Sequence, residues 1–268
     1  MFSVKHGLYG LVAWISISSL PSGAAEQMSL PRADKHMVNV VKYFPDKECQ
    51  GVAIISHGAG GSEYGYAYLA NFLQQQNWLV LVVGHQESGS DVLKQLLRRQ
   101  GMIEALSEMV TTPSFYQARF MDISVVQTWG KQHCAGQRQI MIGHSMGAAT
   151  TMLLAGAENN LNVTAPKLSF DAYIALSPQG VGDIFPKDAW RHISQPVLLL
   201  TGTKDRELHG SWQTRQDAFY SLPVGCKWLG VINGANHLNF AGKGFSQRTE
   251  FLVTQTIKAF IDGVKQQN

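Results

Sequence analysis

Short apolar runs alternate along the chain with longer segments that have helical periodicity. The runs are rich in Val, Ile and Leu and contain few polar positions, a pattern typical of strands buried on both faces of a parallel sheet. They predict strands over residues 52–56, 78–83, 139–143, 172–176, 196–201 and 227–232. Helical spacing of apolar residues predicts helices over 66–76, 91–110, 116–129, 146–157 and 247–264. This alternation predicts an α/β fold, with a mostly parallel central sheet, helices on both faces and right-handed connections.

Composition and length agree with one globular domain. The chain has 268 residues, of which 45% are hydrophobic and 15% charged, which excludes a disordered or coiled-coil protein. No repeat, low-complexity stretch or linker interrupts residues 26–268, and we interpret them as a single domain. A formal charge of +3, from 22 basic and 19 acidic residues, is too small to indicate a nucleic-acid-binding protein.

The N-terminal segment has the pattern of a secretory signal peptide. Lys5 precedes an apolar run without acidic residues over 7–20, and small residues follow at 22–25. Such a pattern predicts that residues 1–25 are removed on export, and a buried first helix is the alternative interpretation. The run is shorter than the roughly 18 apolar residues of a membrane-spanning helix. We therefore expect a secreted or periplasmic protein with no membrane span.

Export would place the three cysteines in an oxidising compartment, where disulfides persist. Cys49 and Cys134 each lie just before an expected strand. If those strands are neighbours in a parallel sheet, both sulfur atoms lie at the same edge of it. We therefore predict a disulfide between these two residues, with Cys226 left over.

The strongest local motif is Gly143-His144-Ser145-Met146-Gly147, which joins an expected strand to an expected helix. This is the context in which a G-x-S-x-G sequence forms a tight turn that presents a serine nucleophile. The residues two positions before and after the serine must be small there, because their Cβ atoms would clash with the turn, and Gly143 and Gly147 meet that need. The helix that follows offers free N–H groups to developing negative charge. We predict that Ser145 is a nucleophile.

A glycine-rich loop over residues 57–61 follows the first expected strand. Such a loop can direct a backbone N–H toward the oxygen of a tetrahedral intermediate, and the residue after the nucleophile supplies a second N–H. We assign the loop donor to Ala59, with Gly60 behind it, and the second donor to Met146. His57 is interpreted as a residue that stabilises the loop.

A serine nucleophile needs a base, and the base needs a carboxylate to orient it. Asp205 and His237 follow Ser145 in the order serine, acid, histidine, and each comes just after an expected strand. Loops at the carboxyl ends of parallel strands gather at one edge of a sheet, so the three side chains can meet there. Asp183 and Asp188 are the alternative positions for the acid.

The sequence contains no motif typical of a metal or cofactor site. It contains neither H-E-x-x-H nor C-x-x-C, and its nine histidines are scattered. Gly58-Ala59-Gly60 begins like a dinucleotide-binding G-x-G-x-x-G motif, but residue 63 is Glu, and no Walker motif is present. We therefore expect no cofactor and no metal.

With these motifs, the chain resembles the α/β-hydrolases, and more narrowly the esterases similar to dienelactone hydrolase and platelet-activating-factor acetylhydrolase. The similar stretches are residues 56–62, 66–70, 118–123, 143–147, 203–205 and 234–237, in the family's order. The resemblance implies the α/β-hydrolase fold, with Ser145, Asp205 and His237 as nucleophile, acid and base. Dienelactone hydrolases use Cys as nucleophile, so the serine here argues against their substrate. The short segment over 179–195 implies little or no lid.

The expected activity is hydrolysis of small-molecule carboxylic esters through an acyl-enzyme. The same groups suit thioester cleavage, amide cleavage or acyl transfer, because these reactions share the charge of their transition states. A binding protein without activity on the same scaffold is the alternative from another class, since fold alone does not establish function.

Overall fold

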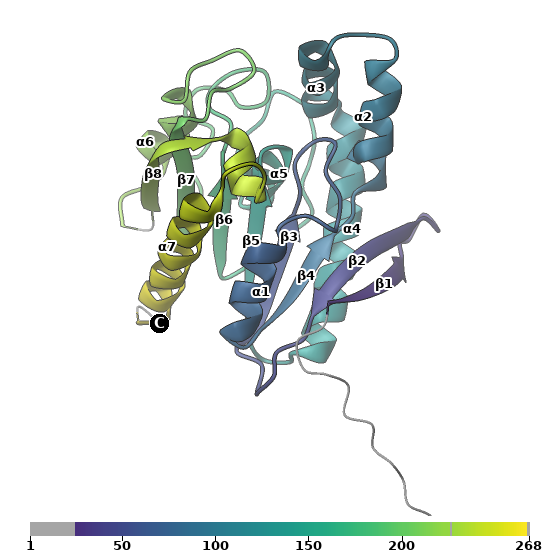
Figure 1. Ribbon diagram of the computed structural model, residues 1–268, viewed down its shortest axis with the longest axis vertical. Coiled ribbons are helices and arrows are strands. Elements are labelled where there is room, and N and C mark those ends of the chain that lie inside the picture. Colours follow the sequence, from purple (N-terminus) through teal and green to yellow (C-terminus); the bar gives the residue numbers. More distant parts are fainter. Residues whose placement is uncertain (1–24, 226, 267–268) are drawn as a thin grey trace, which may run out of the picture.

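The computed structural model describes residues 25–225 and 227–266 (Figure 1). The predicted signal peptide, apart from its last residue, and Cys226 lie outside them. The described residues form an eight-stranded sheet in the order β1-β2-β4-β3-β5-β6-β7-β8. The strands are β1 (Glu26–Pro31), β2 (Met37–Tyr43), β3 (Gly51–Ser56), β4 (Trp78–Val83), β5 (Arg138–His144), β6 (Ala172–Leu176), β7 (Val197–Lys204) and β8 (Lys227–Asn236).

The six strands expected from the apolar runs, β3 to β8, are all present and parallel to one another. The sequence analysis missed β1 and β2, which pair with each other and with β4 in antiparallel fashion. In β1, partly buried residues alternate with exposed ones, and in β2 buried residues mix with exposed or partly exposed ones. Strands with such mixed patterns lack the continuous apolar run by which buried parallel strands are recognised.

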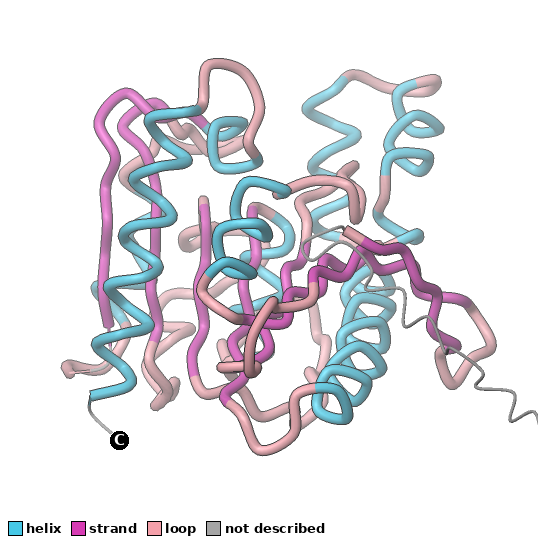
Figure 2. The backbone as a smooth tube through the Cα atoms, turned by 60° about the horizontal axis from the view of Figure 1, so that its bottom comes forward, coloured by secondary structure: helices cyan, strands magenta, loops and turns pink. Residues whose placement is uncertain are grey.

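Helices cover both faces of the sheet (Figures 1 and 2). One apolar layer joins the sheet to α1 and α7, and a second joins the opposite face to α4 and α5. The neighbouring side chains of Ile54 and Ile55 in β3 belong to different layers. The α-helices are α1 (Ala67–Gln75), α2 (Ser90–Leu97), α3 (Met102–Thr111), α4 (Pro113–His133), α5 (Met146–Leu154), α6 (Asp217–Ser221) and α7 (Gln247–Gln266), with short 3-10 turns η1 (Gln86–Ser88), η2 (Thr214–Gln216) and η3 (His237–Ala241).

The single helix expected over 91–110 is wrong, because the chain forms two helices there, α2 and α3. They are separated by residues 98–101, and Gly101 caps α3 with an extended backbone. Each helix keeps helical spacing of its apolar residues, so the pattern concealed the break. Both helices stand beyond the carboxyl ends of the strands (Figure 1).

Two expectations about membranes and lids can be compared with these elements. No helix within residues 25–225 and 227–266 is both long and apolar enough to cross a membrane. The segment between β6 and β7, whose shortness implied little or no lid, forms no helix.

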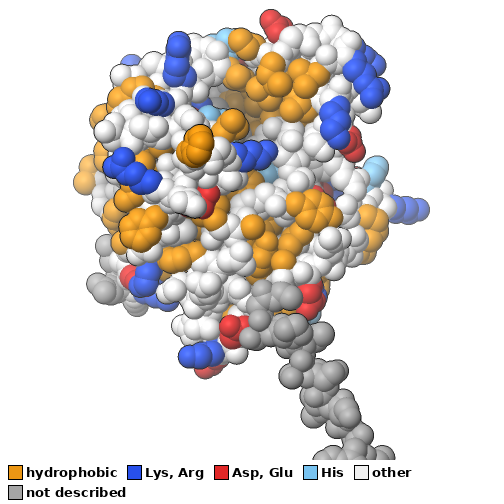
Figure 3. Space-filling model, in the orientation of Figure 1, with side chains coloured by type: hydrophobic (Ala, Val, Ile, Leu, Met, Phe, Trp, Pro, Cys, Tyr) orange, Lys and Arg blue, Asp and Glu red, His pale blue; other side chains and the backbone are white. Residues whose placement is uncertain are grey.

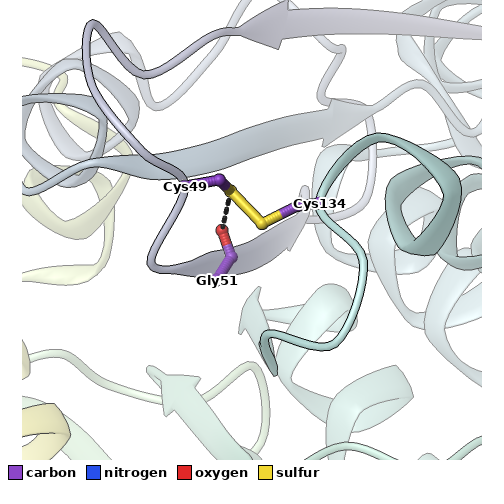
Figure 4. Close-up of a disulfide and its surroundings, with 3 residues drawn as sticks. All are labelled: Cys49, Gly51 and Cys134. Carbon is purple, nitrogen blue, oxygen red and sulfur yellow. Dashed lines mark hydrogen bonds between the residues drawn. A yellow bond between two sulfur atoms is a disulfide. The ribbon is translucent and has the colours of Figure 1, made fainter.

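The predicted disulfide between Cys49 and Cys134 is present, with the two Cα atoms 5.9 Å apart (Figure 4). Its sequence argument is confirmed too, because β3 and β5 are parallel neighbours and Gly51 lies opposite Arg138. The Sγ atom of Cys49 also lies 3.3 Å from the carbonyl oxygen of Gly51. The bridge therefore ties the start of β3 to the end of α4.

Replacing Cys49 and Cys134 together by Ser is expected to lower the free energy of unfolding by about 2–4 kcal/mol. The bridge spans 85 positions of the chain, so its removal frees a long loop in the unfolded state. Urea denaturation of the oxidised native protein and the double variant measures the difference. The reduced native protein should match the variant, and equal midpoints for all three would contradict the prediction.

Candidate active site

Ser145 lies between the end of β5 and the start of α5, in a backbone conformation with φ 56° and ψ −120°. This conformation is rare for a residue with a side chain. A Cβ atom on Gly143 would overlap the carbonyl oxygen of Gly147, and one on Gly147 would overlap that of Ser56. The steric requirement for glycine at both positions of the G-x-S-x-G motif is thus present in the turn.

The glycine-rich loop after β3 lies against this serine. A Cβ atom on Gly58 would be 3.1 Å from the Cβ atom of Ser145. The N–H of Gly60 donates to the carbonyl oxygen of Ser88 at 3.0 Å, so it supports the loop and is not available to a substrate. The N–H of Ala59 donates to no group among residues 25–225 and 227–266, although Ala59 lines the same cavity as Ser145. Of the two residues, Ala59 is therefore the available donor.

Met146 is the first residue of α5, and its N–H has no partner within the helix. Its side chain is buried in the apolar layer beneath the turn. The backbone of α5 therefore begins beside Ser145 with an unused donor, as the sequence motif predicts.

Asp205 and His237 are brought together from the ends of β7 and β8. The Nδ1 atom of His237 donates to Oδ1 of Asp205 at 2.8 Å. The carboxylate is fully buried, whereas the His237 side chain is one-third exposed and lines the cavity with Ser145. Because Nδ1 faces the carboxylate, Nε2 is left for a proton from another group. Within the described residues no hydrogen bond joins Ser145 Oγ to His237, and such contacts often tighten only when substrate binds.

Arg215, which the sequence analysis did not single out, holds the carboxylate in place. Its Nε atom lies 3.0 Å from Oδ1 of Asp205 and also donates to the Asp205 carbonyl oxygen. Burial raises the pKa of Asp205, but the hydrogen bond from His237 and the Arg215 charge outweigh it, so this pKa lies below its ordinary value. Arg215 belongs to the short turn η2, and no motif marked it in the sequence.

His144 and Tyr66 connect the glycine-rich loop to His237. Nε2 of His144 lies 3.1 Å from the carbonyl oxygen of His237 and must donate to it. Nδ1 then accepts from the Tyr66 hydroxyl at 2.8 Å, and that hydroxyl accepts from the Gly58 N–H at 3.3 Å. Burial, followed by the nearby His237, lowers the pKa of His144 well below its ordinary value, so this imidazole stays neutral. One chain of hydrogen bonds thus fixes both sides of the cavity.

Replacing Tyr66 by Phe is expected to lower kcat for a p-nitrophenyl ester about tenfold with little change in KM. The loss of one hydroxyl leaves the buried Gly58 N–H and His144 Nδ1 unpaired, at about 1–3 kcal/mol for a buried group, and loosens the loop. Tyr173→Phe is the matched control, because it removes a buried hydroxyl from β6. Equal kinetics for both variants would refute a positioning role for Tyr66.

A second Ser-His-Asp set lies beneath the loop but is closed to substrate. Ser56 Oγ lies 2.9 Å from Nε2 of His85, whose Nδ1 lies 2.8 Å from Oδ2 of Asp122. These three residues are each at most 2% exposed, and none lines the cavity. Arg119 donates to Ser56 Oγ at 3.1 Å and to the carbonyl oxygen of His57 at 2.7 Å. The set is therefore a buried support for the glycine-rich loop.

Ser145 and His237 open into one cavity of about 630 Å³. Figure 3 shows a hollow in the upper part of the molecule with hydrophobic side chains gathered beside it. Of the alternative acids, Asp183 lies at the exposed edge of this cavity and Asp188 does not line it. Asp205 alone among the three aspartates contacts the imidazole of His237. This arrangement has the groups needed for nucleophilic attack on a carbonyl carbon.

Comparison with known proteins gives likeness in structure only. No protein-family model matches the chain, and no curated protein matches it. An α/β serine hydrolase without a lid from Xanthomonas campestris superposes with a TM-score of 0.60 at 15% identity, over 91% of this chain and 95% of that one.

Two further structures give the same result. An esterase from an Arctic intertidal metagenomic library has a TM-score of 0.62 at 17% identity, with 91% and 99% covered. A dienelactone hydrolase from Anabaena variabilis has a TM-score of 0.55 at 18% identity, with 87% and 96% covered. At such identities the comparison shows the fold, which is the α/β-hydrolase fold expected from the sequence.

Proposed function

We propose, from the α/β-hydrolase fold and the groups that meet in its cavity, that this protein is a serine hydrolase of carboxylic esters. The observation that carries the proposal is the 2.8 Å hydrogen bond from His237 Nδ1 to the buried Asp205, in a cavity that also contains Ser145. A carboxylate, an imidazole and a hydroxyl with these roles form the constellation of acyl-transfer enzymes.

In the proposed reaction, Ser145 Oγ attacks the ester carbonyl carbon while Nε2 of His237 takes the hydroxyl proton. The imidazolium then gives this proton to the departing alcohol, which leaves an acyl group on Ser145. A water molecule attacks the acyl carbon, passes a proton to His237, and the acid is released as the Ser145 hydroxyl regains its proton. Asp205 holds the imidazole and stabilises its cation throughout.

The N–H groups of Ala59 and Met146 would bind the oxyanion of both tetrahedral intermediates. Each donor of this kind contributes about 3–4 kcal/mol to transition-state stabilisation. The available N–H of Ala59 and the unused first N–H of α5 support this assignment.

A fluorophosphonate probe tests the proposal. It should label the native protein at Ser145 and leave Ser145→Ala unlabelled, as shown by mass spectrometry of the tryptic peptides. A folded native protein that stays unlabelled would instead indicate a binding protein on this scaffold. Hydrolysis of matched ester, thioester and amide substrates then identifies the bond, with the ester expected to be cleaved fastest.

We also propose that the protein is exported to the periplasm or secreted. Support comes from the signal-like pattern over residues 1–25 and from the Cys49–Cys134 bridge, which needs an oxidising compartment to persist. N-terminal sequencing of the protein from its producing cells should begin at Ala25 or Glu26. A chain that retains the apolar run over 7–20 would overturn this proposal.

A further inference from the structure

The helices α2 and α3 form an apolar wall along the cavity that holds Ser145. Leu93 of α2 and Leu106 and Val110 of α3 line the cavity, and the buried Ile184 lines it from the segment after β6. The wall is inserted after β4, whereas the segment between β6 and β7 forms no helix. Substrate bound at Ser145 therefore lies beside an apolar surface that the segment between β4 and β5 provides.

The rim of the cavity carries several large apolar side chains in addition to the exposed, charged Asp183, Arg206 and Lys243. Met102, Val181, Leu208 and Leu238 line it from four separate segments and are between 40% and 56% exposed. A group of large, solvent-exposed apolar side chains at the mouth of a cavity is typical of a ligand-binding surface. An apolar ligand would cover them and gain the favourable free energy of removing that surface from water.

The buried charged groups that line the cavity are already committed to the protein. Arg215 donates to Asp205 and to the carbonyl oxygens of Ser177 and Pro178. Oε1 of Glu207 accepts from the N–H of Gly180 at 2.7 Å, and burial raises the pKa of this carboxyl group. Neither of these two charges is therefore free for a substrate, and the other charged residues of the lining, Asp183, Arg206 and Lys243, are exposed, so the interior favours an uncharged, apolar group.

A hydrogen bond also fixes the wall across the cavity. Ser107 Oγ of α3 lies 2.9 Å from Nε2 of His209, which belongs to the loop after Asp205. Both residues line the cavity, so the bond joins the wall to the loop that carries the proposed acid. This exposed hydrogen bond therefore connects the two sides of the apolar space.

From these contacts we propose that the α2–α3 wall is the subsite for a long apolar group of the ester, and that it determines the chain length the enzyme accepts. This inference rests on the proposed function. The shared chemistry is an unbranched hydrocarbon chain of medium length, attached to the scissile ester on its acyl or its alcohol side. Substrates with only one or two carbons there would leave the wall and rim uncovered.

Two substrate series separate the acyl side from the alcohol side: p-nitrophenyl acetate against p-nitrophenyl octanoate, and ethyl acetate against octyl acetate. We expect the native protein to prefer the longer member of one series by about tenfold or more in kcat/KM, because each buried methylene contributes about 0.8 kcal/mol. Leu106→Trp, which fills the space beside the wall, should remove most of this preference for the longer ester. No preference in either series overturns the inference.

Met102 and Ile103 provide a matched pair of variants. They are neighbours in α3 and are 52% and 53% exposed, but only Met102 lines the cavity. Met102→Ser should lower kcat/KM for the preferred long ester about threefold to tenfold, and Ile103→Ser should leave it unchanged. Equal effects of the two substitutions would show a general effect of the helix surface and would contradict a subsite at Met102.

A binding measurement keeps this inference separate from the proposed function. If the fluorophosphonate probe fails to label Ser145, the hydrolase proposal fails, but titration of the protein with octanol still tests the wall. The native protein should bind octanol at least about tenfold more tightly than Leu106→Trp does, measured by calorimetry. Equal or undetectable binding to both proteins overturns the subsite, whatever the outcome of labelling.

Discussion

Replacing Ser145 by Ala is expected to lower kcat/KM for a p-nitrophenyl ester by about five to six orders of magnitude. The hydroxyl is the proposed nucleophile, and without it neither the acyl-enzyme nor the proton transfer to His237 can occur. The oxyanion donors and the cavity remain, so a small rate above the uncatalysed reaction should persist. Steady-state kinetics with highly purified protein measures the loss.

The backbone at this position makes the substitution a clean test. Alanine has the same Cβ atom as serine and meets the same strain at φ 56°, so the turn should form with unchanged stability. We expect the midpoint of thermal unfolding to shift by no more than about 2 °C. Ser114→Ala, at an exposed position of α4, serves as the control with native activity. If Ser145→Ala kept more than a hundredth of native activity, the nucleophile would have to be another group.

Replacing Asp205 by Asn should lower kcat about ten-thousand-fold, because the amide no longer holds the imidazole in the tautomer that accepts a proton at Nε2. The carboxylate accepts a hydrogen bond from His237, with Nδ1 and Oδ1 2.8 Å apart, and also forms an ion pair with Arg215. Asn keeps the shape of the side chain but removes the charge that stabilises the imidazolium. The variant should show this loss in kcat with intact fluorescence and circular dichroism spectra.

Asp183→Asn is the matched control, since Asp183 lies at the exposed edge of the cavity and was the alternative acid. Its kcat should stay within about twofold of native, in line with a surface substitution away from the reacting groups. A collapse of turnover in Asp183→Asn alone would reverse the assignment of the acid.

The lowered pKa of Asp205 also predicts the direction of its pH dependence. Because this pKa is lower in the folded protein than in the unfolded chain, the ionised carboxylate stabilises the fold above the ordinary aspartate pKa. That stabilisation is lost as the pH falls through the lowered value. Acid unfolding should therefore depend less on pH in Asp205→Asn than in the native protein.

The apolar runs were sufficient to predict β3 to β8. The strands β3 to β7 are buried on both faces and have hardly any polar position, whereas β8, at the edge of the sheet, is partly exposed but begins with a mostly apolar run. The same reasoning could not find β1 and β2, because both antiparallel strands mix exposed and buried positions and so lack a continuous apolar run. It also merged α2 with α3, since periodicity records which face is apolar and carries little information about where a helix stops. The position of these helices beside the cavity followed only from the structure.

For the site, the residue types in short motifs and their order along the chain were enough to select candidate residues. Glycine at 143 and 147 is required by contacts within one turn, and Asp205 and His237 occupy strand ends, so both features can be recognised along the chain. Disulfide pairing between Cys49 and Cys134 followed in the same way from the adjacency of two strands. These are short-range or topological properties, which a sequence pattern records directly.

What the amino-acid sequence determined by itself was therefore the presence of the six parallel strands, the turn at Ser145 and the candidate acid and base. Only the tertiary structure decided that Arg215 supports Asp205, that Tyr66 and His144 connect the loop to His237, and that α2 and α3 wall the cavity. The physical reason is that each of these contacts joins side chains from different elements, and the repeat of apolar residues within one element does not indicate which other element it meets. Their distances and burial arise only when the whole sheet brings its strand ends together.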